Sequence, residues 1–466
     1  MTLLDLVPFA AVAAALGVGA LLVGRGAGIR MAGIGLLLAG SAPLVLTRVA
    51  GLLDLAGEHP LLAAIAALAG AGLVAGGAAL FLGRPWLIAV LAVLAGLRIP
   101  LSFSDPSPTN HLVVLWLVIL AGLASFAWRG IKDDWPAPRL GAVGWALAAF
   151  VLLVAASLFW STDPGAGGYT FVAFYAPFGA LAAMVGSMEI RGRLPVALGT
   201  TQVVLAVIVS LVALYQLKAG HIFWNPDLME GNVRLTYFRT NSLFWDASAL
   251  GRFQALAILT IIGTLALGAR QRSVLGAAAL CGLIFVGLDL SYSRAGLAML
   301  ILGILLLAAC WRPRVVLPLG AVALIGAVGV LAVTGGVSWE RITSSRTAIA
   351  EQGFHAFQSA PVIGVGLGGY PSSHSVALGV AAELGVIGLI ALLALLAVAV
   401  RAAIRPATPG RDRALRAVVA VELAAIFAHS MIDSGLFDDG ATWVLLAILA
   451  VSASASPGTP VPDARP

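Results

Sequence analysis

Residues 341–393 read RITSSRTAIAEQGFHAFQSAPVIGVGLGGYPSSHSVALGVAAELGVIGLIALL, and the change within this stretch from polar to apolar sequence indicates the architecture. The second half, from Val376, is one of many apolar runs that are long enough to cross a membrane, since a spanning helix needs about 20 mostly apolar residues. The first half belongs to the longest gap between such runs, residues 335–375. Loops of more than roughly 15 residues are usually functional or disordered, so we expect the chemistry of this protein in that gap.

An amphipathic helix is predicted in this polar segment, from Arg346 to about Ser359. Apolar and polar positions follow each other there with the period of an α-helix. Pro361 lacks an N–H and disfavours helix in the residue before it, so the helix should end near Ser359. The apolar stripe consists of Ala350, Phe354 and Phe357, and the polar stripe of Thr347, Glu351, His355 and Gln358. A glycine-rich turn follows, and His374 stands directly before the next apolar run.

Composition assigns the whole chain to a membrane. Hydrophobic residues make up 61% and charged residues 10% of the 466 positions, and the mean hydropathy is +1.03, which excludes a soluble globular protein. The alternating segments of an outer-membrane barrel are absent from the sequence, so the spans should be helical. We predict an all-α fold: a polytopic membrane helical bundle of about 12–15 transmembrane helices with an outward-facing helical loop.

Fifteen apolar runs are candidate spans. No soluble domain fits between them. The first run lacks the basic start and the cleavage site of a signal peptide, so it is interpreted as a retained helix. The runs lie near residues 6–23, 31–50, 61–82, 86–101, 111–128, 140–160, 169–187, 194–217, 247–268, 274–290, 295–310, 315–334, 376–400, 416–433 and 441–455.

The basic residues predict the orientation, because cytoplasmic loops carry an excess of lysine and arginine. One set of alternate loops holds 18 of the 27 basic residues, and we assign that set to the cytoplasm. The other set contains the acidic loops and the segment 335–375, which should therefore face outward. The same asymmetry explains the net charge of +6 and gives no argument for nucleic-acid binding.

Motifs for metals and nucleotides are absent from the sequence. The two cysteines, Cys281 and Cys310, lie inside predicted spans and give neither a disulfide framework nor a metal cluster. The chain has no zinc-type spacing of His, Cys and carboxylates, no P-loop and no Rossmann glycine pattern. We therefore expect no metal and no cofactor.

Nine basic residues oppose the positive-inside bias. Arg48 and Arg98 can reach the interface from helix ends, whereas the other seven cluster in three outward segments, 218–252, 291–294 and 341–346. The nine are Arg48, Arg98, Lys218, Arg234, Arg239, Arg252, Arg294, Arg341 and Arg346.

The first cluster leads into a helix that should begin near Ala247, with Asp246 placed to cap it. Arg239 lies just before that helix, and Arg252 lies about two turns inside it. Two interpretations remain open for Arg239. It forms an ion pair with Asp246 that holds the loop, or it grips a phosphate, for which arginine is suited because its fork donates two hydrogen bonds and keeps its charge.

The second cluster is the turn Ser291-Tyr292-Ser293-Arg294 between two short spans. An arginine buried unpaired at membrane depth costs at least a few kcal/mol, so Arg294 should have a partner. Asp289, one turn away, and an anionic ligand are the two alternatives.

In order, the segments RTNSLFWDAS, SYSRAG, SAPVIGVGLGGY, HS and AELGVIGL, within residues 234–393, resemble the O-antigen ligase and O-antigen polymerase superfamily of membrane glycosyltransferases. The resemblance implies a glycan donor linked to undecaprenyl pyrophosphate, an acceptor hydroxyl, and a location in the bacterial inner membrane with the site facing outward. It implies a metal-independent reaction. It further implies that Arg239 and Arg294 hold the pyrophosphate and that His374 is the catalytic histidine of the loop.

This resemblance divides the chain into N-terminal transmembrane helices (1–230), a catalytic transmembrane region (231–455) with the outward loop 335–375, and a disordered cytoplasmic tail (456–466). Acceptors of the family include glycans, glycolipids and proteins. Arg346, Asp246 and Tyr370 complete the predicted substrate-binding set, although Tyr370 also suits the interfacial aromatic belt.

Simple chemistry is consistent with these roles. Displacement of a lipid pyrophosphate from an anomeric carbon leaves a highly charged group, which preorganised arginines stabilise. One direct displacement should invert the configuration at that carbon. The acceptor hydroxyl must lose a proton, and histidine has the unperturbed pKa closest to neutral.

A transporter or flippase for a lipid-linked or anionic substrate is the alternative function. Its polar pathway would consist of Arg294, Asp289, Glu422, His429 and Asp433. Glu422 and His429 are seven residues apart on one helix face, and they also suit a purely structural role in the bundle. No convincing internal repeat supports transport.

Overall fold

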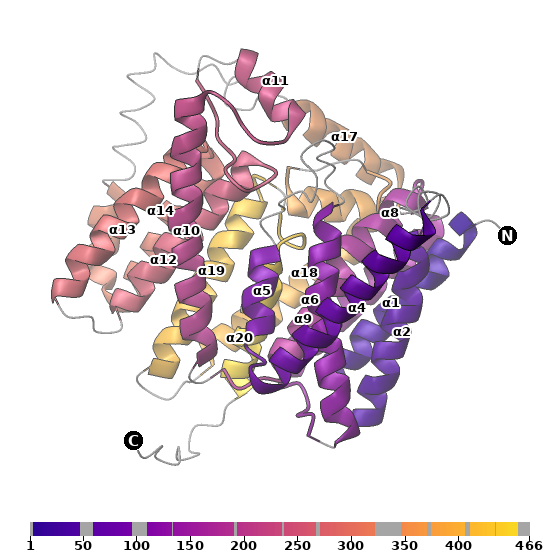
Figure 1. Ribbon diagram of the computed structural model, residues 1–466. Helices are drawn as coiled ribbons and strands as arrows, with labels where there is room; N and C mark the ends of the chain where they lie inside the picture. Colours follow the sequence, from indigo (N-terminus) through magenta and orange to yellow (C-terminus); the bar gives the residue numbers. More distant parts are fainter. Residues whose placement is uncertain are drawn as a thin grey trace, which may run out of the picture.

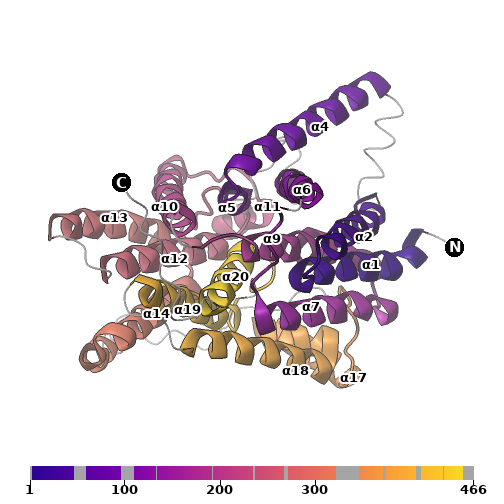
Figure 2. The same cartoon turned by 90° about the horizontal axis from the view of Figure 1, so that it is seen from below.

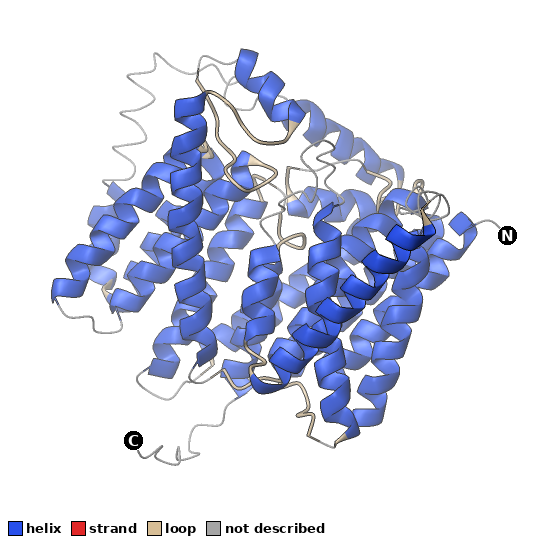
Figure 3. Cartoon of the chain, viewed as in Figure 1, coloured by secondary structure: helices blue, strands red, loops and turns tan. Residues whose placement is uncertain are grey.

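The computed structural model describes residues 3–46, 59–95, 110–132, 134–190, 193–234, 237–266, 271–321, 346–370, 374–405, 411–433 and 435–454. Within these ranges the protein contains 17 α-helices and no strand, so the predicted all-α helical bundle is confirmed (Figure 3). The predictions for Arg48, Arg98, Arg341 and the tail 456–466 lie outside the described residues. The α-helices are α1 (Leu3–Val23), α2 (Ala27–Leu46), α4 (Pro60–Gly83), α5 (Leu87–Ala95), α6 (Asn110–Ile131), α7 (Gly141–Ala156), α8 (Pro164–Thr170), α9 (Ala176–Gly186), α10 (Arg193–Ala219), α11 (Pro226–Arg234), α12 (Ala247–Ala266), α13 (Gln271–Leu290), α14 (Arg294–Trp311), α17 (Arg346–Ser359), α18 (Val376–Ile404), α19 (Arg411–Ser430) and α20 (Gly440–Ser454).

Eleven helical segments are long and apolar enough to cross a membrane, so the protein is a multi-pass membrane protein. Each of them coincides with one of the fifteen apolar runs. The remaining runs differ in length or extent: 86–101 contains the nine-residue α5, 416–433 belongs to α19, and 441–455 is the short α20. The run 315–334 is described only as far as residue 321.

The centre of the bundle is formed by α9 and α20, which pack against each other. Their residues are almost all buried because both helices are apolar around their whole circumference. On one side α1 packs against α2, α7 and α9, and on the other α12 packs against α10, α13, α14 and α19. Figure 2 shows α4 extending away from the bundle, with only 6% of its apolar window buried.

Two helices mark one end of the bundle. Figure 1 shows α11 and α17 at the end opposite the C terminus. We call this the α11/α17 end. The chain segments that lead into α12 and α18 begin there as well, because α11 precedes α12 and α17 precedes α18.

The helix α18 is interrupted near its start. Gly385 has φ 64° and ψ −159°, so the chain leaves the helical path for one residue. The segment 361–369 fills the interruption: the N–H groups of Val365 and Gly366 donate to the carbonyls of Ala382 and Glu383, and that of Val386 donates to the Pro361 carbonyl. The backbone groups freed by the break are thus paired within the protein, as membrane depth requires.

The glycines of this segment have a packing role. Gly364, Gly366 and Gly368 all have positive φ, and an added Cβ would meet the backbone of Glu383, Ser161 and Gly167 respectively at 2.2–2.3 Å. The glycine-rich turn therefore allows the loop to approach α8 and α18 closely.

Replacement of Gly385 by alanine should destabilise the protein. The backbone conformation of Gly385 is essentially restricted to glycine. Another residue held in such a conformation costs roughly 1–3 kcal/mol in strain. A Cβ would also lie 2.4 Å from the carbonyl group of Val362. We expect a lower midpoint of thermal unfolding for purified G385A, measured in detergent. The matched control is Gly276→Ala on α13, where a Cβ meets nothing within 4 Å; equal midpoints for both variants would contradict this account.

Candidate functional site

The segment that carries Arg239 packs against the turn that carries Arg294. The N–H of Thr240 donates to the Leu290 carbonyl at 3.0 Å, and the Arg239 Nε donates to the Ser291 carbonyl at 3.3 Å. On its other side, Asn232 of α11 holds the main chain of Arg239 through two hydrogen bonds of 2.8 and 3.0 Å. Two segments about 50 residues apart in the sequence therefore meet at the α11/α17 end.

The serines and the glycine of the second motif build this turn. Ser291 donates to the Leu288 carbonyl and accepts from the Ser293 N–H, while Ser293 caps α14 by accepting from the Gly296 N–H at 3.0 Å. Tyr292 has φ 50°, which is uncommon for a residue other than glycine. Gly296 is required because a Cβ there would meet the backbone of Gly251 in α12 at 2.9 Å.

Arg294 differs from its neighbours in the motif. Its side chain is exposed at the first position of α14, so the expectation of a buried arginine is wrong. No ion pair joins it to Asp289, which is exposed. The Arg239–Asp246 ion pair is likewise absent, although the structure describes both residues. The two carboxylates that we considered as structural partners of the arginines are therefore not their partners.

Asp246 confirms its predicted capping role. Its Oδ2 accepts from the N–H of Ser248 at 3.1 Å, in the first turn of α12. The polar residues before it form a buried network. The Ser242 N–H donates to Gln216 Oε1 of α10 at 2.8 Å, the Ser242 carbonyl accepts from Gln216 Nε2 at 3.2 Å, and Asn241 donates to the Trp245 carbonyl. This network fixes the entry of α12 and with it the position of Arg239.

The predicted amphipathic helix is α17, and its end at Ser359 is confirmed. Thr347, Glu351, His355 and Gln358 are exposed, as predicted. The inward face is shifted, however. Gly353 is the buried residue because Leu378 and Tyr370 occupy the space beside it, whereas Phe354 is 52% exposed.

Tyr370 lies between the loop and this helix. Its ring is 7% exposed and its hydroxyl donates to the Ile349 carbonyl at 2.5 Å. Burial raises the pKa of the Tyr370 phenol, which keeps the donor proton in place. In the structure Tyr370 therefore packs the loop against α17, and little of its surface is exposed.

His374 and Arg346 stand at the starts of two helices. His374 is half-buried and precedes Ser375, the N-cap of α18, as the sequence predicted. Arg346 is the first residue of α17. Figure 2 shows α17 beside α18 and α11 away from both, so the His374 and Arg239–Arg294 regions share one end of the bundle and lie over different helices.

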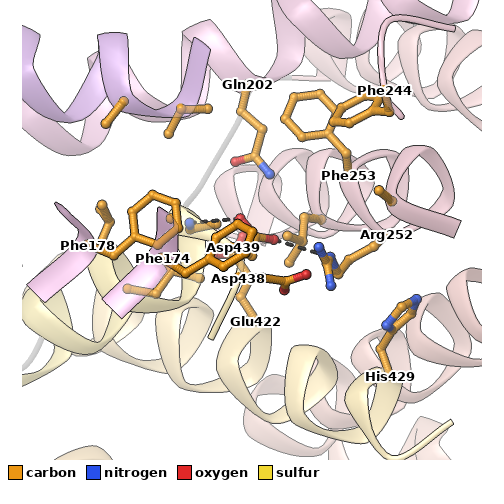
Figure 4. A pocket seen from close by; sticks show the side chains of 18 of the residues that line it. Phe174, Phe178, Gln202, Phe244, Arg252, Phe253, Glu422, His429, Asp438 and Asp439 are labelled. Carbon is orange, nitrogen blue, oxygen red and sulfur yellow. Dashed lines mark hydrogen bonds and ion pairs between the residues drawn. The ribbon is translucent and has the colours of Figure 1, made fainter. Parts of the chain in front are cut away.

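A cavity of about 260 Å³ that is lined by several charged side chains lies among α5, α9, α10, α12, α19 and α20 (Figure 4). The residues around it come from segments other than 346–370. Arg252 dominates it: the side chain is 8% exposed, its Nε pairs with Asp439 at 3.2 Å, and its Nη1 donates to the Gly435 carbonyl at 2.9 Å. Asp439 also caps α20 by accepting from the Ala441 N–H at 2.9 Å.

Two polar residues of the cavity lining, Gln202 and Glu422, share a partner. The hydroxyl of Thr260 lies 2.6 Å from Glu422 Oε1 and 3.3 Å from Gln202 Oε1. The charged and titratable lining residues are Asp246, Arg252, Glu422, His429, Asp433, Asp438 and Asp439. Three residues of the transport alternative, Glu422, His429 and Asp433, are thus brought together, whereas Asp289 and Arg294 are not among the lining residues.

The cavity is the feature that sequence reasoning missed. In the sequence, Arg252 is a basic residue inside an apolar run, and Asp438 and Asp439 belong to an acidic loop. The signal was present, because an arginine inside a membrane span requires a partner and these acidic residues are available later in the chain. Their sequence separation of almost 190 residues concealed the pairing. Among the described residues, no group of three or more His, Cys, Asp or Glu is placed to hold a metal ion.

Comparison with known proteins finds no protein family whose pattern matches the chain and no curated protein with significant similarity to it. Fold and site define a polytopic membrane protein of the helical-bundle type, with Arg239 and the exposed Arg294 at one end of the bundle and a cavity with several charged side chains in the interior.

Proposed function

We propose that this protein is a membrane glycosyltransferase that moves a glycan from a polyprenyl pyrophosphate donor to an acceptor hydroxyl. The observation that carries the proposal is the junction of Arg239 with the Ser291–Arg294 turn at the ends of membrane-spanning helices. The Arg239 side chain thereby contacts the turn that ends in Arg294. Arginine forks suit a pyrophosphate because they donate bidentate hydrogen bonds and stay charged.

The proposed reaction is a single displacement. The acceptor hydroxyl oxygen attacks the anomeric carbon and forms the new glycosidic bond, while the bond from that carbon to the pyrophosphate oxygen breaks. The electron pair leaves with the lipid pyrophosphate, whose charge Arg239 and Arg294 stabilise. The hydroxyl proton passes to His374. The configuration at the anomeric carbon is inverted.

The direct test is an incubation of purified protein with a polyprenyl-pyrophosphate-linked oligosaccharide. Formation of a longer lipid-linked glycan indicates polymerase activity, and formation of a new glycoconjugate with an added acceptor indicates ligase activity. An intact donor under both conditions, with properly folded protein, would contradict the proposal. The orientation that we propose places the α11/α17 end outside the bacterial inner membrane.

Accessibility of Glu351 tests that orientation. Glu351 is exposed on α17, so a cysteine at this position should react with a membrane-impermeant thiol reagent in intact cells. Cys281 and Cys310 are first replaced by serine to remove the background. The matched control is Arg401→Cys, an exposed position in the last turn of α18, which should react only after the membrane is opened. The reverse pattern would invert the topology and remove the basis of the enzyme proposal.

Transport of a lipid-linked or anionic substrate is the second candidate, and the interior cavity favours it. Polar side chains deep in a helical bundle mark substrate or ion pathways. Reconstitution into liposomes separates the two functions, because a transporter moves a fluorescent polyprenyl pyrophosphate between leaflets and leaves its glycan unchanged. Glycan transfer without such movement supports the enzyme.

A further inference from the structure

The cavity beside Arg252 has a charge pattern that does not suit a phosphate. Five carboxyl groups line it, from Asp246, Asp433, Asp438, Asp439 and Glu422, against one arginine. In a medium of low dielectric constant such an excess of carboxylates repels an anion strongly. The pyrophosphate that we assign to Arg239 and Arg294 is therefore not expected to enter this cavity.

Arg252 itself is held in place. Its Nε and Nη1 are occupied by Asp439 and Gly435, and the residue is more than nine-tenths buried. The Arg252 side chain also lines the cavity. A guanidinium that is held in this way at a cavity wall suits a neutral acceptor such as a hydroxyl or carbonyl oxygen, because it can only donate hydrogen bonds.

The walls combine polar and aromatic groups. Carboxylates and the Gln202 amide can form hydrogen bonds, while Phe253 and Phe244 provide apolar faces (Figure 4). Trp245 also lines the cavity. Such a mixture of a few placed polar groups and aromatic rings is typical of small-molecule sites. The volume of about 260 Å³ is slightly below the roughly 300–1,000 Å³ of drug-sized ligand sites, which suits a group of the size of one sugar ring.

The cavity is also close to the arginine turn in the fold. Gly251 of α12 precedes Arg252, and a Cβ on Gly251 would lie 2.4 Å from the Cβ of Ser293, next to Arg294. The start of α12 therefore has the arginine turn on one side and the cavity on the other.

We propose that the Arg252 cavity binds a sugar ring of the lipid-linked donor, with the carboxylates and Arg252 bonding its hydroxyl groups and the aromatic side chains packing on its carbon face. This inference rests on the proposed function, since it assigns the glycan of the same donor whose pyrophosphate contacts Arg239 and Arg294. The sugar specificity of the enzyme would then be determined in the interior of the bundle rather than by segment 335–375.

Binding measurements in nanodiscs test the inference separately from the proposed function. The probes are undecaprenyl pyrophosphate alone and the same lipid carrying one glucose, galactose or N-acetylglucosamine. We expect the wild-type protein to bind the sugar-free lipid, and to bind at least one sugar-bearing lipid about tenfold more tightly or better, since hydrogen bonds in a dry site discriminate strongly. Equal affinities for all four lipids would overturn the cavity inference while the proposed function stands, and failure to bind any of them would count against the proposed function itself.

Two variants locate the sugar. Ala441→Leu introduces bulk at the cavity wall, and Asp438→Asn keeps the shape while removing a charge. In both variants the sugar-bearing lipid should no longer bind more tightly than the sugar-free lipid, whereas the affinity for the sugar-free lipid should be unchanged. Ala278→Leu, at an exposed position of α13, is the matched control and should still bind the sugar-bearing lipid more tightly. If this difference in affinity persists in both cavity variants, the sugar binds elsewhere and the inference is wrong.

Discussion

Replacing Arg239 or Arg294 by lysine is expected to lower the rate of glycan transfer sharply, with a cost of about 2–4 kcal/mol in the barrier by analogy with the loss of one oxyanion-hole donor. Lysine keeps the positive charge but loses the planar fork that donates two hydrogen bonds to a phosphate. The effect should appear in turnover of a lipid-linked donor by purified protein, with expression and thermal stability close to those of the wild type.

Arg312→Lys is the matched control for this experiment. Arg312 is an exposed arginine at the opposite end of α14, directly after the last helical residue, and its replacement should leave transfer unchanged. Near wild-type turnover in both R239K and R294K would refute the assignment of the pyrophosphate to these arginines. A loss of turnover in R312K as well would indicate a general effect of charge on the protein.

Replacing His374 by alanine is expected to abolish transfer and to leave donor binding nearly intact. A general base contributes typically 10²–10⁴-fold to a rate, whereas the affinity for the donor should depend on the arginines. The half-buried position of His374 directly before the N-cap of α18 places it on a helix start that is held by the loop 361–369. The measurement is a comparison of turnover with binding of undecaprenyl pyrophosphate to the same protein preparation.

His355→Ala is the matched control, because His355 is exposed on the polar face of α17. Loss of donor binding in H374A would assign His374 to the pyrophosphate site instead. Transfer at the normal rate would make the histidine structural, and the acceptor proton would then need another base or none.

The helix α17 illustrates how far a local pattern extends. Its polar face and its end at Ser359 were predicted, because a proline and the 3.6-residue period act over a few residues. Its buried face was predicted about one position away from where it lies. The closest contact is made by Gly353, and only the packing of Leu378 and Tyr370 against it explains why a glycine is buried there.

The broken helix α18 shows the opposite case. A glycine inside an apolar run is ordinary in membrane helices, so no local pattern predicted a break at Gly385. The break depends on the segment 361–369, which supplies partners for the freed N–H and C=O groups. The structure also explains the serines of the second motif, because Ser291 and Ser293 form the turn that exposes Arg294.

By itself the sequence determined that this is a polytopic membrane protein of α-helices, where most spans lie, where α12 is capped and which arginines stand before helix starts. These properties depend on composition and on contacts within one or two turns of a helix. Tertiary structure alone decided that Arg239 meets the Ser291–Arg294 turn, that Arg252 pairs with Asp439, and that Glu422, His429 and Asp433 share a cavity. These contacts join helices far apart in the chain, and an apolar helix offers its neighbours several faces of similar hydrophobicity, so only the packed bundle selects among them.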